Sequence, residues 1–259
     1  MKSNDVIVFS LGLSALFLSL TVNANTLSAE EKKNVTHIIQ LFKSKDINAI
    51  SQLIDYPLER ENPIPAIHNA NELKVRFHQV FDQKLIQTIA QSKHDQWSNM
   101  GWRGVMLDDG TIWLNDKKIR TVNYSGPAEQ KYRQQLLNQQ KSKLHPSIAE
   151  FKEPMLLFKT AHYVVRVDQL KNDQYRYASW KLGKTQSSKP DLVLTRGDIT
   201  IDGSGGNHHY TFKSGAYAYI VYRNMIGTSD TPDVNLIVTK KDKEILNQQG
   251  QLIPYNASK

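Results

Sequence analysis

The 259-residue sequence contains no cysteine. This excludes a disulfide framework, cysteine-ligated zinc, an iron–sulfur cluster and a thiol nucleophile. The sequence also lacks any block of five or six like charges, although 33 Lys and Arg against 25 Asp and Glu give a net charge of +8. Nucleic-acid-binding chains usually gather their basic residues into such blocks or stripes. We therefore expect no nucleic-acid partner, and an anionic envelope component or another protein as the target of the positive field.

Only one long apolar run is present, from Val6 to Val22, and it follows Lys2. The run ends in Val22-Asn23-Ala24, which places small residues at the −3 and −1 positions of a signal-peptidase site. Its 17 residues also approach the length of a membrane span, so a permanent anchor is the alternative. The small-residue ending favours a cleaved signal peptide over residues 1–24. We expect a periplasmic or secreted bacterial protein with no membrane span after cleavage.

Residues 25–126 change from helical periodicity to strand alternation. Ser28 and Glu31 form the S-x-x-E pattern of a capping box, and further caps at Asp46 and Asn69 predict two more helices. After Trp97 the apolar period falls to about two, with turn residues at regular intervals. The predicted strands, which should form an antiparallel meander, are Gly101–Leu107, Thr111–Leu114 and Lys118–Tyr124.

The order of three helices and a curved sheet resembles the NTF2-like α+β cone fold. The segments that carry the likeness are Asp55–Leu58, Ile67–Leu73 and Gly104–Trp113, within residues 28–125. The whole layout is also similar to that of uncharacterised exported bacterial proteins. The resemblance implies a cone-shaped fold. In isomerases, dehydratases and polyketide cyclases of the family the cone holds the active site, and in other members it is a binding or dimerisation module. It makes His78, Asp82 and Tyr124 the candidate interior groups.

The second half of the chain is predicted to be all-β. The Gly126-Pro127 pair should start a polar helix, whose large apolar residues are Tyr132, Leu136 and Leu137. This helix and the residues after it, 127–150, are expected to connect the two domains. Residues 151–259 then carry short strands bounded by turn residues, which predicts an antiparallel sandwich or a small barrel in an α+β chain. The expected strands include Leu156–Leu170, Gln174–Trp180, Leu192–Thr195, Ile199–Asp202, His208–Lys213, Ala216–Arg223 and Val234–Thr239.

The glycine-rich segment 202–209 invites two functional interpretations, and neither is favoured. Asp202-Gly-Ser-Gly-Gly206 inverts the first two residues of the serine-protease pattern and lacks the first glycine of G-x-S-x-G. Its glycines could direct N–H groups at an anion, and His208 and His209 could bind a metal. Adjacent residues of a strand face opposite sides, however, so both histidines cannot reach one ion without distortion. We expect a structural loop and keep His208 as a candidate binding residue.

Two further groups of side chains stand out. Trp102 and Trp113 should lie on adjoining strands with Arg103 between them, where core packing is the default and a ligand or partner surface is the alternative. Arg166 and Arg176 should lie on neighbouring strands, with Asp168 opposite Arg176. We interpret these three as a surface ion pair rather than a site.

No acid–base, metal or nucleophile constellation emerges from the sequence, so we assign no catalytic residue, metal ligand or cofactor. The leading hypothesis is an exported two-domain binding protein of the kind found among inhibitors, immunity proteins and envelope-associated modules. The alternative is an NTF2-like hydrolase or isomerase with a site inside the cone of residues 28–125. The partner-binding candidates are Trp102, Arg103, Trp113, His78, Tyr124 and His208.

Overall fold

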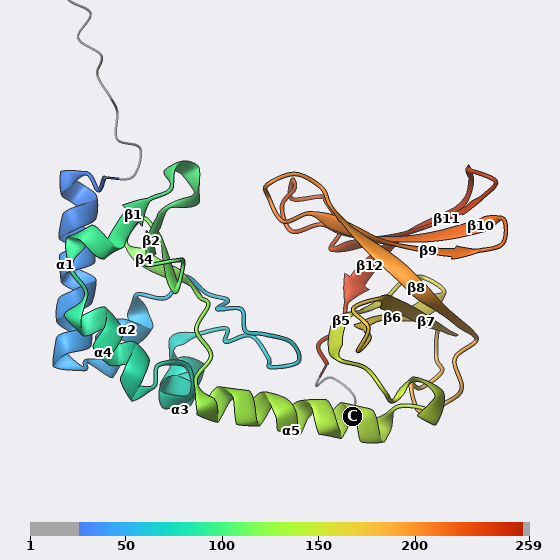
Figure 1. Cartoon of the computed structure of the whole chain (residues 1–259), viewed down its shortest axis with the longest axis horizontal. Coiled ribbons are helices and arrows are strands. Elements are labelled where there is room, and N and C mark those ends of the chain that lie inside the picture. The colour runs from blue at the N-terminus through green and yellow to red at the C-terminus, as the bar shows by residue number, and fades with distance from the viewer. Residues whose placement is uncertain (1–25, 256–259) are drawn as a thin grey trace, which may run out of the picture.

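The computed structural model describes residues 26–255 and consists of two lobes joined by one long helix (Figure 1). The predicted signal peptide therefore lies outside the described residues. Among residues 26–255, no helix combines the length and the apolar character that crossing a membrane requires. The first lobe contains helices α1 (Ala29–Ser44), α2 (Ile47–Gln52), α3 (Ala70–Val80) and α4 (Gln83–Gln91), and strands β1 (Trp97–Asn99), β2 (Val105–Leu107), β3 (Ile112–Asn115) and β4 (Lys118–Val122).

The helices of the first lobe begin where the predicted caps are. The Ser28 hydroxyl accepts from the Glu31 amide while the Glu31 carboxylate accepts from the Ser28 amide, which completes the capping box. Asp46 and Asn69 cap α2 and α3 by accepting from backbone amides of the first turn, without the reciprocal bond. The apolar stripes of α1, α3 and α4 pack against the sheet in one cluster, in which the Phe81 ring contacts those of Phe42 and Phe77. Helix α4 was not predicted as separate, and it begins anew because Asp82 caps it.

The four short strands form an antiparallel sheet in the order β1-β2-β3-β4, as the predicted meander requires. The prediction of one strand over Gly101–Leu107 is wrong, because residues 101–103 form a 3-10 turn between β1 and β2. Gly101 and Gly104 have φ angles of +66° and +94°, which interrupt an extended chain and which other residues adopt only with strain. Gly104 also lies against the backbone carbonyl of Leu114, where no side chain fits.

The second lobe is a closed eight-stranded barrel, which resolves the alternative between a sandwich and a barrel. Every strand pairs antiparallel with the next along the chain, and the last pairs with the first. Closure leaves no free sheet edge in this lobe. The strands are β5 (Glu153–Lys159), β6 (Tyr163–Gln169), β7 (Tyr175–Lys181), β8 (Leu192–Ile201), β9 (His208–Ser214), β10 (Tyr217–Arg223), β11 (Val234–Lys240) and β12 (Lys243–Leu252).

Three strand predictions for the barrel are corrected. The expected long strand Leu156–Leu170 is two strands, because the chain reverses at residues 160–162 and the Thr160 amide donates to the Tyr163 carbonyl. The expected strands Leu192–Thr195 and Ile199–Asp202 are one strand, β8, with a register shift against β7 and Arg196 at a φ of +61°. Strand β12 was not predicted, since polar residues dominate its sequence.

The barrel interior is filled by side chains. Tyr177, Tyr210 and Phe212 are buried there among aliphatic residues of β5, β6, β8, β10 and β11. Tyr177 packs against Phe212 with ring centroids 5.6 Å apart. The interior therefore serves as the core of the lobe, and the side chains of interest for binding lie on the outside of the barrel.

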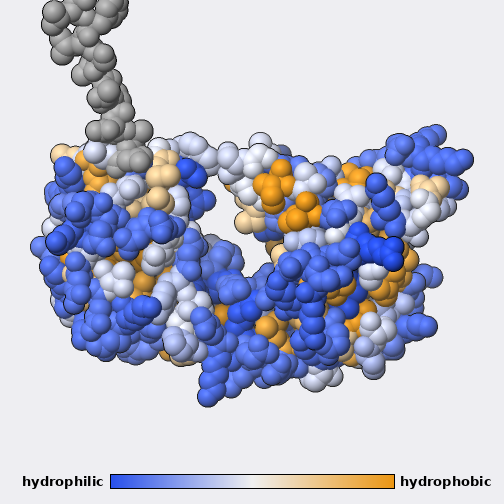
Figure 2. Space-filling view, viewed as in Figure 1, coloured by the Kyte–Doolittle hydropathy of each residue, from blue (hydrophilic) through white to orange (hydrophobic). Residues whose placement is uncertain are grey.

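Helix α5 (Pro127–Lys143) runs beneath both lobes and contacts each of them (Figure 1). Near its start, Glu129 is buried and accepts from Arg60 of the first lobe at 2.8 Å. Near its end, Leu137 packs in a small cluster with Phe151 and Trp180 on the outside of the barrel. Above α5 a hollow separates the lobes, and apolar side chains gather on the barrel end that borders it (Figure 2). In the barrel lobe, Ile201 at the end of β8 and Met225 and Ile226 after β10 are exposed apolar residues.

Candidate functional site

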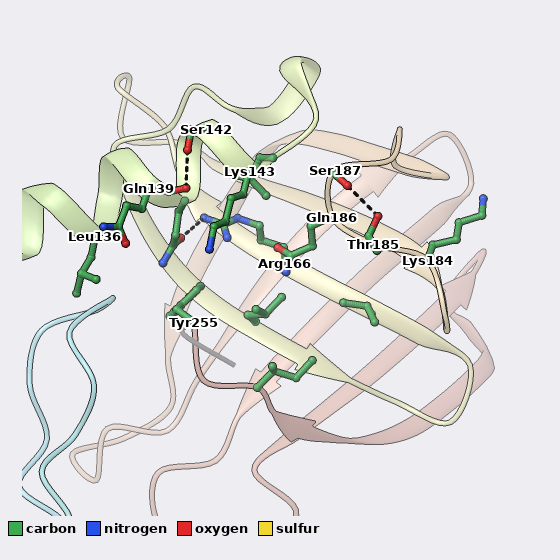
Figure 3. Close-up of a pocket in the computed structure, with 15 residues that line it drawn as sticks. Leu136, Gln139, Ser142, Lys143, Arg166, Lys184, Thr185, Gln186, Ser187 and Tyr255 are labelled. Atoms are coloured by element: carbon green, nitrogen blue, oxygen red, sulfur yellow. Dashed lines mark hydrogen bonds between the residues drawn. The ribbon is translucent and has the colours of Figure 1, made fainter. Parts of the chain in front are cut away.

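A pocket of about 700 Å³ lies between the end of α5, the outer face of β5 and β6, the loop after β7, and the segment after β12. We call it the α5 pocket. Figure 3 shows Arg166 of β6 lying between the helix end that carries Lys143, the loop of Thr185 and Gln186, and Tyr255. Its volume falls in the range of small-molecule sites. Four separate segments build this pocket, so its shape depends on the docking of α5 against the barrel.

Arg166, at the floor of the α5 pocket, belongs to a buried ion cluster. Asp168 is 0% exposed and accepts from Arg166 Nε and from Arg176 Nη2, each at 2.7 Å. Arg166 and Arg176 are only 1% and 4% exposed. The predicted register is confirmed, because Asp168 pairs directly with Arg176. The interpretation as a surface ion pair is wrong, since all three side chains are buried.

The cluster is buried because α5 and the segment after it cover this part of the barrel's outer face. Arg176 donates to the backbone carbonyls of Ile148 and Glu150, which lie in that segment. Trp180 shares the outer face of β7 with Arg176 and is fully buried, as is Ala178. A buried tryptophan pointing away from the barrel interior needs a covering element. The alternation of Arg176, Ala178 and Trp180 was the sequence signal that this face is covered.

The guanidinium of Arg166 is held firmly but is not saturated with hydrogen bonds. It lies over the ring of Phe151, 4.8 Å from the centroid, and over that of Tyr255 at 5.5 Å. Its Nη2 donates to the Gln140 side-chain oxygen at 3.1 Å. Its Nη1 donates to no acceptor among residues 26–255. The stacked rings and the two hydrogen bonds fix the plane of the guanidinium, so a free donor remains at a defined position.

Two further donors of the α5 pocket lack partners. The Gln140 Nε2 and Tyr255 Oη atoms are buried and find no acceptor in the described part of the chain. Burial raises the pKa of Tyr255, so its hydroxyl stays protonated and able to donate at neutral pH. An unsatisfied buried donor is costly, and native proteins leave few of them. Two such donors line this pocket beside the free Nη1 of Arg166, and one buried acceptor, Gln186 Oε1, also lacks a partner there, so the lining offers polar groups for a ligand to pair with.

The charges around the α5 pocket all have the same sign. Its lining includes Arg166, Lys143 and Lys184 and, within the described residues, no Asp or Glu. Lys143 is exposed on the last turn of α5, and Lys184 forms an ion pair with Asp191 outside the pocket. The pocket therefore has a positive potential, with its only buried charged side chain at the floor.

The structure places the tryptophans singled out from the sequence in different environments. Trp102 lies in the 3-10 turn and is 74% exposed, whereas Trp113 is half-buried on β3. Arg103, in the same turn, lies over the Trp113 ring, 5.9 Å from its centroid. Trp97, which precedes the strands, is the tryptophan that packs in the core of this lobe. Trp102 thus remains an exposed candidate, apart from the other two.

Of the candidate interior groups of the first lobe, Asp82 and Tyr124 lie in contact, whereas His78 is at the surface on α3. The Tyr124 hydroxyl donates to Asp82 Oδ2 at 2.7 Å, while Asp82 Oδ1 accepts from the Leu85 amide at the start of α4. Both carboxylate oxygens of Asp82 are therefore used in holding the end of β4 against the cap of α4. This arrangement is structural in character.

The histidines of segment 202–209 lie on opposite faces of β9, as predicted. His208 Nδ1 contacts the Gly206 carbonyl at 2.8 Å, and its ring packs edge-on against Tyr210. His209 pairs with Asp202 at 2.9 Å and stacks on Tyr222. Within residues 26–255, no three His, Cys, Asp or Glu side chains are arranged to hold a metal ion. Local hydrogen bonds account for both histidines.

The Tyr124–Asp82 contact makes a measurable prediction for alkaline solution. Burial, together with the hydrogen bond to Asp82, raises the pKa of Tyr124 to about 12. An unfolded tyrosine ionises near pH 10. The contribution of Tyr124 to stability is therefore complete below pH 10 and is lost as pH rises from about 10 to about 12. In an NMR titration of tyrosine labelled with ¹³C at Cζ, Asp82→Asn should move the Tyr124 midpoint to lower pH. An unchanged midpoint would contradict the assigned contact.

Comparison with known proteins found no relative of this chain: no protein-family model, no curated protein and no solved structure matches it.

Proposed function

We propose that this chain is an exported binding protein and that the α5 pocket is its binding site, which takes an anionic ligand. The observation that carries the proposal is the Arg166–Asp168–Arg176 cluster, in which two guanidinium groups share one carboxylate and Arg166 lines the pocket. A buried cluster with an excess positive charge is expensive to maintain unless a further anion approaches it. An occupied pocket supplies that anion.

The arrangement of residues in the α5 pocket supports ligand binding rather than catalysis. Arg166 is locked between two rings and fixed by Asp168 and Gln140, as in sites whose geometry is set before the ligand arrives. The α5 pocket lining contains Ser and Thr hydroxyls but, among the described residues, neither a histidine nor a carboxylate that could act as their base. The arrangement fits recognition of a charged group without its conversion.

The setting of this function is proposed from the sequence pattern of residues 1–24. A cleaved signal peptide would deliver the protein to the periplasm or the exterior, where envelope components and other proteins offer anionic groups. A role as an inhibitor, an immunity protein or an envelope-associated module is compatible with such a site. The NTF2-like relationship of residues 28–125 is likewise a proposal, and it is supported by the order of the helices and the antiparallel meander.

An enzymatic site inside the first lobe receives less support. The cluster between the helices and the sheet is apolar, with Phe42, Phe77 and Phe81 fully or almost fully buried in it. The Tyr124–Asp82 pair, which the family resemblance would favour, is engaged in capping α4. We therefore place the function of the protein in the α5 pocket.

The test uses 1-anilinonaphthalene-8-sulfonate, a fluorescent anion with an apolar ring system, as the probe. We expect saturable fluorescence enhancement with the full chain. Val164→Trp should reduce it at least tenfold, because Val164 lines the α5 pocket and a larger side chain there fills it. Val193→Trp is the matched control, since Val193 is an exposed valine of the same barrel outside the pocket. It should bind the probe as the parent chain does.

A second control separates the pocket from exposed apolar surface elsewhere on the barrel lobe. Ile226→Ser removes such surface and should leave the saturable binding unchanged. Absence of saturable binding by the parent chain, or equal binding by the Val164→Trp variant, would overturn the proposed function. Unfolding temperatures of the three variants would show that each remains folded.

A further inference from the structure

We infer that the ligand of the α5 pocket is a monocarboxylate with an apolar tail, an inference that rests on the proposed function. The carboxylate would accept from Arg166 at the floor of the pocket, and the tail would lie along the apolar wall. The inference depends on two features that anion binding alone does not require: the number of uncompensated buried charges and the composition of the lining.

The charge count favours a ligand with one negative charge. Asp168 neutralises one of the two buried guanidinium groups, which leaves a single positive charge in excess. Lys184 is already paired with Asp191, and Lys143 is an exposed side chain whose charge water and salt screen. A phosphate monoester dianion or a polyanion would bring more charge than the floor compensates. A monoanion would leave the buried group of charges neutral.

The donors favour a planar acceptor with two oxygens. The free Nη1 of Arg166 and the unpaired Tyr255 Oη and Gln140 Nε2 all belong to residues that line the same pocket. Carboxylates accept several hydrogen bonds in one plane and match the fork of a guanidinium group. The Tyr255 ring lies over the same guanidinium, so its hydroxyl is near the position that such a head group would occupy.

The remaining lining favours an apolar tail. The side chains of α5, β5, β6 and the segment after β12 that contribute to this wall are Leu136, Leu144, Leu157, Val164 and Ile253. A small hydrophilic anion such as acetate or phosphate would leave this surface in contact with water. Each methylene group buried against the wall should tighten binding about threefold to fourfold. A pocket of about 700 Å³ has room for a medium-length chain or an aromatic ring.

The experiment compares ligands that share one tail and differ in the head group. Decanoate, decyl phosphate, 1-decanol and decyltrimethylammonium would each displace the anilinonaphthalenesulfonate probe from the full chain. We expect decanoate to bind at least tenfold more tightly than the other three. In the series from butanoate to decanoate, affinity should rise with every added pair of methylene groups until the wall is covered.

A substitution that adds an internal anion tests the charge count directly. Gln140→Glu places a carboxylate against Arg166, where the Gln140 oxygen now accepts from Nη2. The preference for decanoate over decanol should then disappear, because the added carboxylate repels the anion and not the alcohol. Gln139→Glu is the matched control, because it makes the same change of charge on an exposed residue at the rim. It should lower the decanoate affinity by no more than about twofold at physiological salt.

The outcomes distinguish this inference from the proposed function. If the probe binds in the α5 pocket but decanol or the cationic ligand competes as well as decanoate, the pocket does not select an anion, and both the inference and the anionic ligand of the proposed function are wrong. If decyl phosphate binds more tightly than decanoate, the ligand is a dianion and the inferred monocarboxylate is wrong. If affinity does not change with chain length from butanoate to decanoate, the inferred apolar tail is wrong. If the probe does not bind in the pocket at all, the proposed function itself fails.

Discussion

Replacing Asp168 by asparagine is expected to cost about 3–5 kcal/mol of unfolding free energy. Asp168 is 0% exposed and bridges Arg166 and Arg176 with hydrogen bonds of 2.7 Å. Asparagine keeps the size of the side chain but leaves two buried cations without a counterion. Urea denaturation of the full chain, followed by near-ultraviolet circular dichroism, measures the change.

An exposed ion pair of the same lobe provides the control for this prediction. Asp173 pairs with Lys152 at 2.6 Å, and both side chains are largely in water. Asp173→Asn should therefore change the unfolding free energy by less than about 1 kcal/mol. A loss below about 1 kcal/mol for Asp168→Asn as well would show that water reaches the cluster, and it would remove the reason to expect an anion there.

The cluster's role in binding can be separated from its role in stability. Replacing Asp168, Arg166 and Arg176 together by leucine and methionine removes every charge and keeps the site filled. Such replacements of buried ion clusters are often neutral or stabilising. We would then expect a folded chain whose α5 pocket no longer binds anionic probes. This combination would indicate that the cluster is kept for binding rather than for stability.

Much of the fold follows from local sequence patterns. Helix starts are marked by local signals: the capping side chains of Ser28, Asp46 and Asn69, and the proline in the first turn of α5. A cap bonds to backbone amides two or three residues away and a proline restricts its own backbone, so both can be recognised from the sequence alone. The change from helical to strand periodicity near Trp97 is equally local. The failures lie where a turn has no glycine or proline, as between β5 and β6, or where a strand is mostly polar, as in β12.

The candidate site was less predictable because its parts are distant in the sequence. The pairing of Asp168 with Arg176 followed from the hairpin, but its burial depends on α5 and the segment around Ile148, which pack from elsewhere. Tyr255 reaches the same pocket after the last strand. Alternation along a strand says which side chains share a face, and it does not say whether that face is in water. In a barrel, the outward face can be covered as completely as the inward one.

The second large effect is expected inside the barrel, at Gly197 of β8. Gly197 is buried, and a Cβ atom there would lie 2.1 Å from Cε1 of Phe212. The adjoining residues Asp198 and Thr211 are paired between β8 and β9, and the phenylalanine ring covers the glycine. Gly197→Val should force this ring out of its position in a filled core. We expect a loss of about 3 kcal/mol of unfolding free energy, measured by urea denaturation.

A double-mutant cycle tests whether the cost arises from this one contact. Phe212→Leu alone should destabilise the barrel, because it removes part of a fully buried ring. In the Gly197→Val background the same change makes room for the valine, so the two losses should fall short of additivity by about 1 kcal/mol or more. Thr195→Val, at an exposed position of the same strand, should be close to neutral and controls for the β-branched side chain. Additive losses would mean that the valine collides with something other than Phe212, and the packing assigned to β8 and β9 would then be wrong.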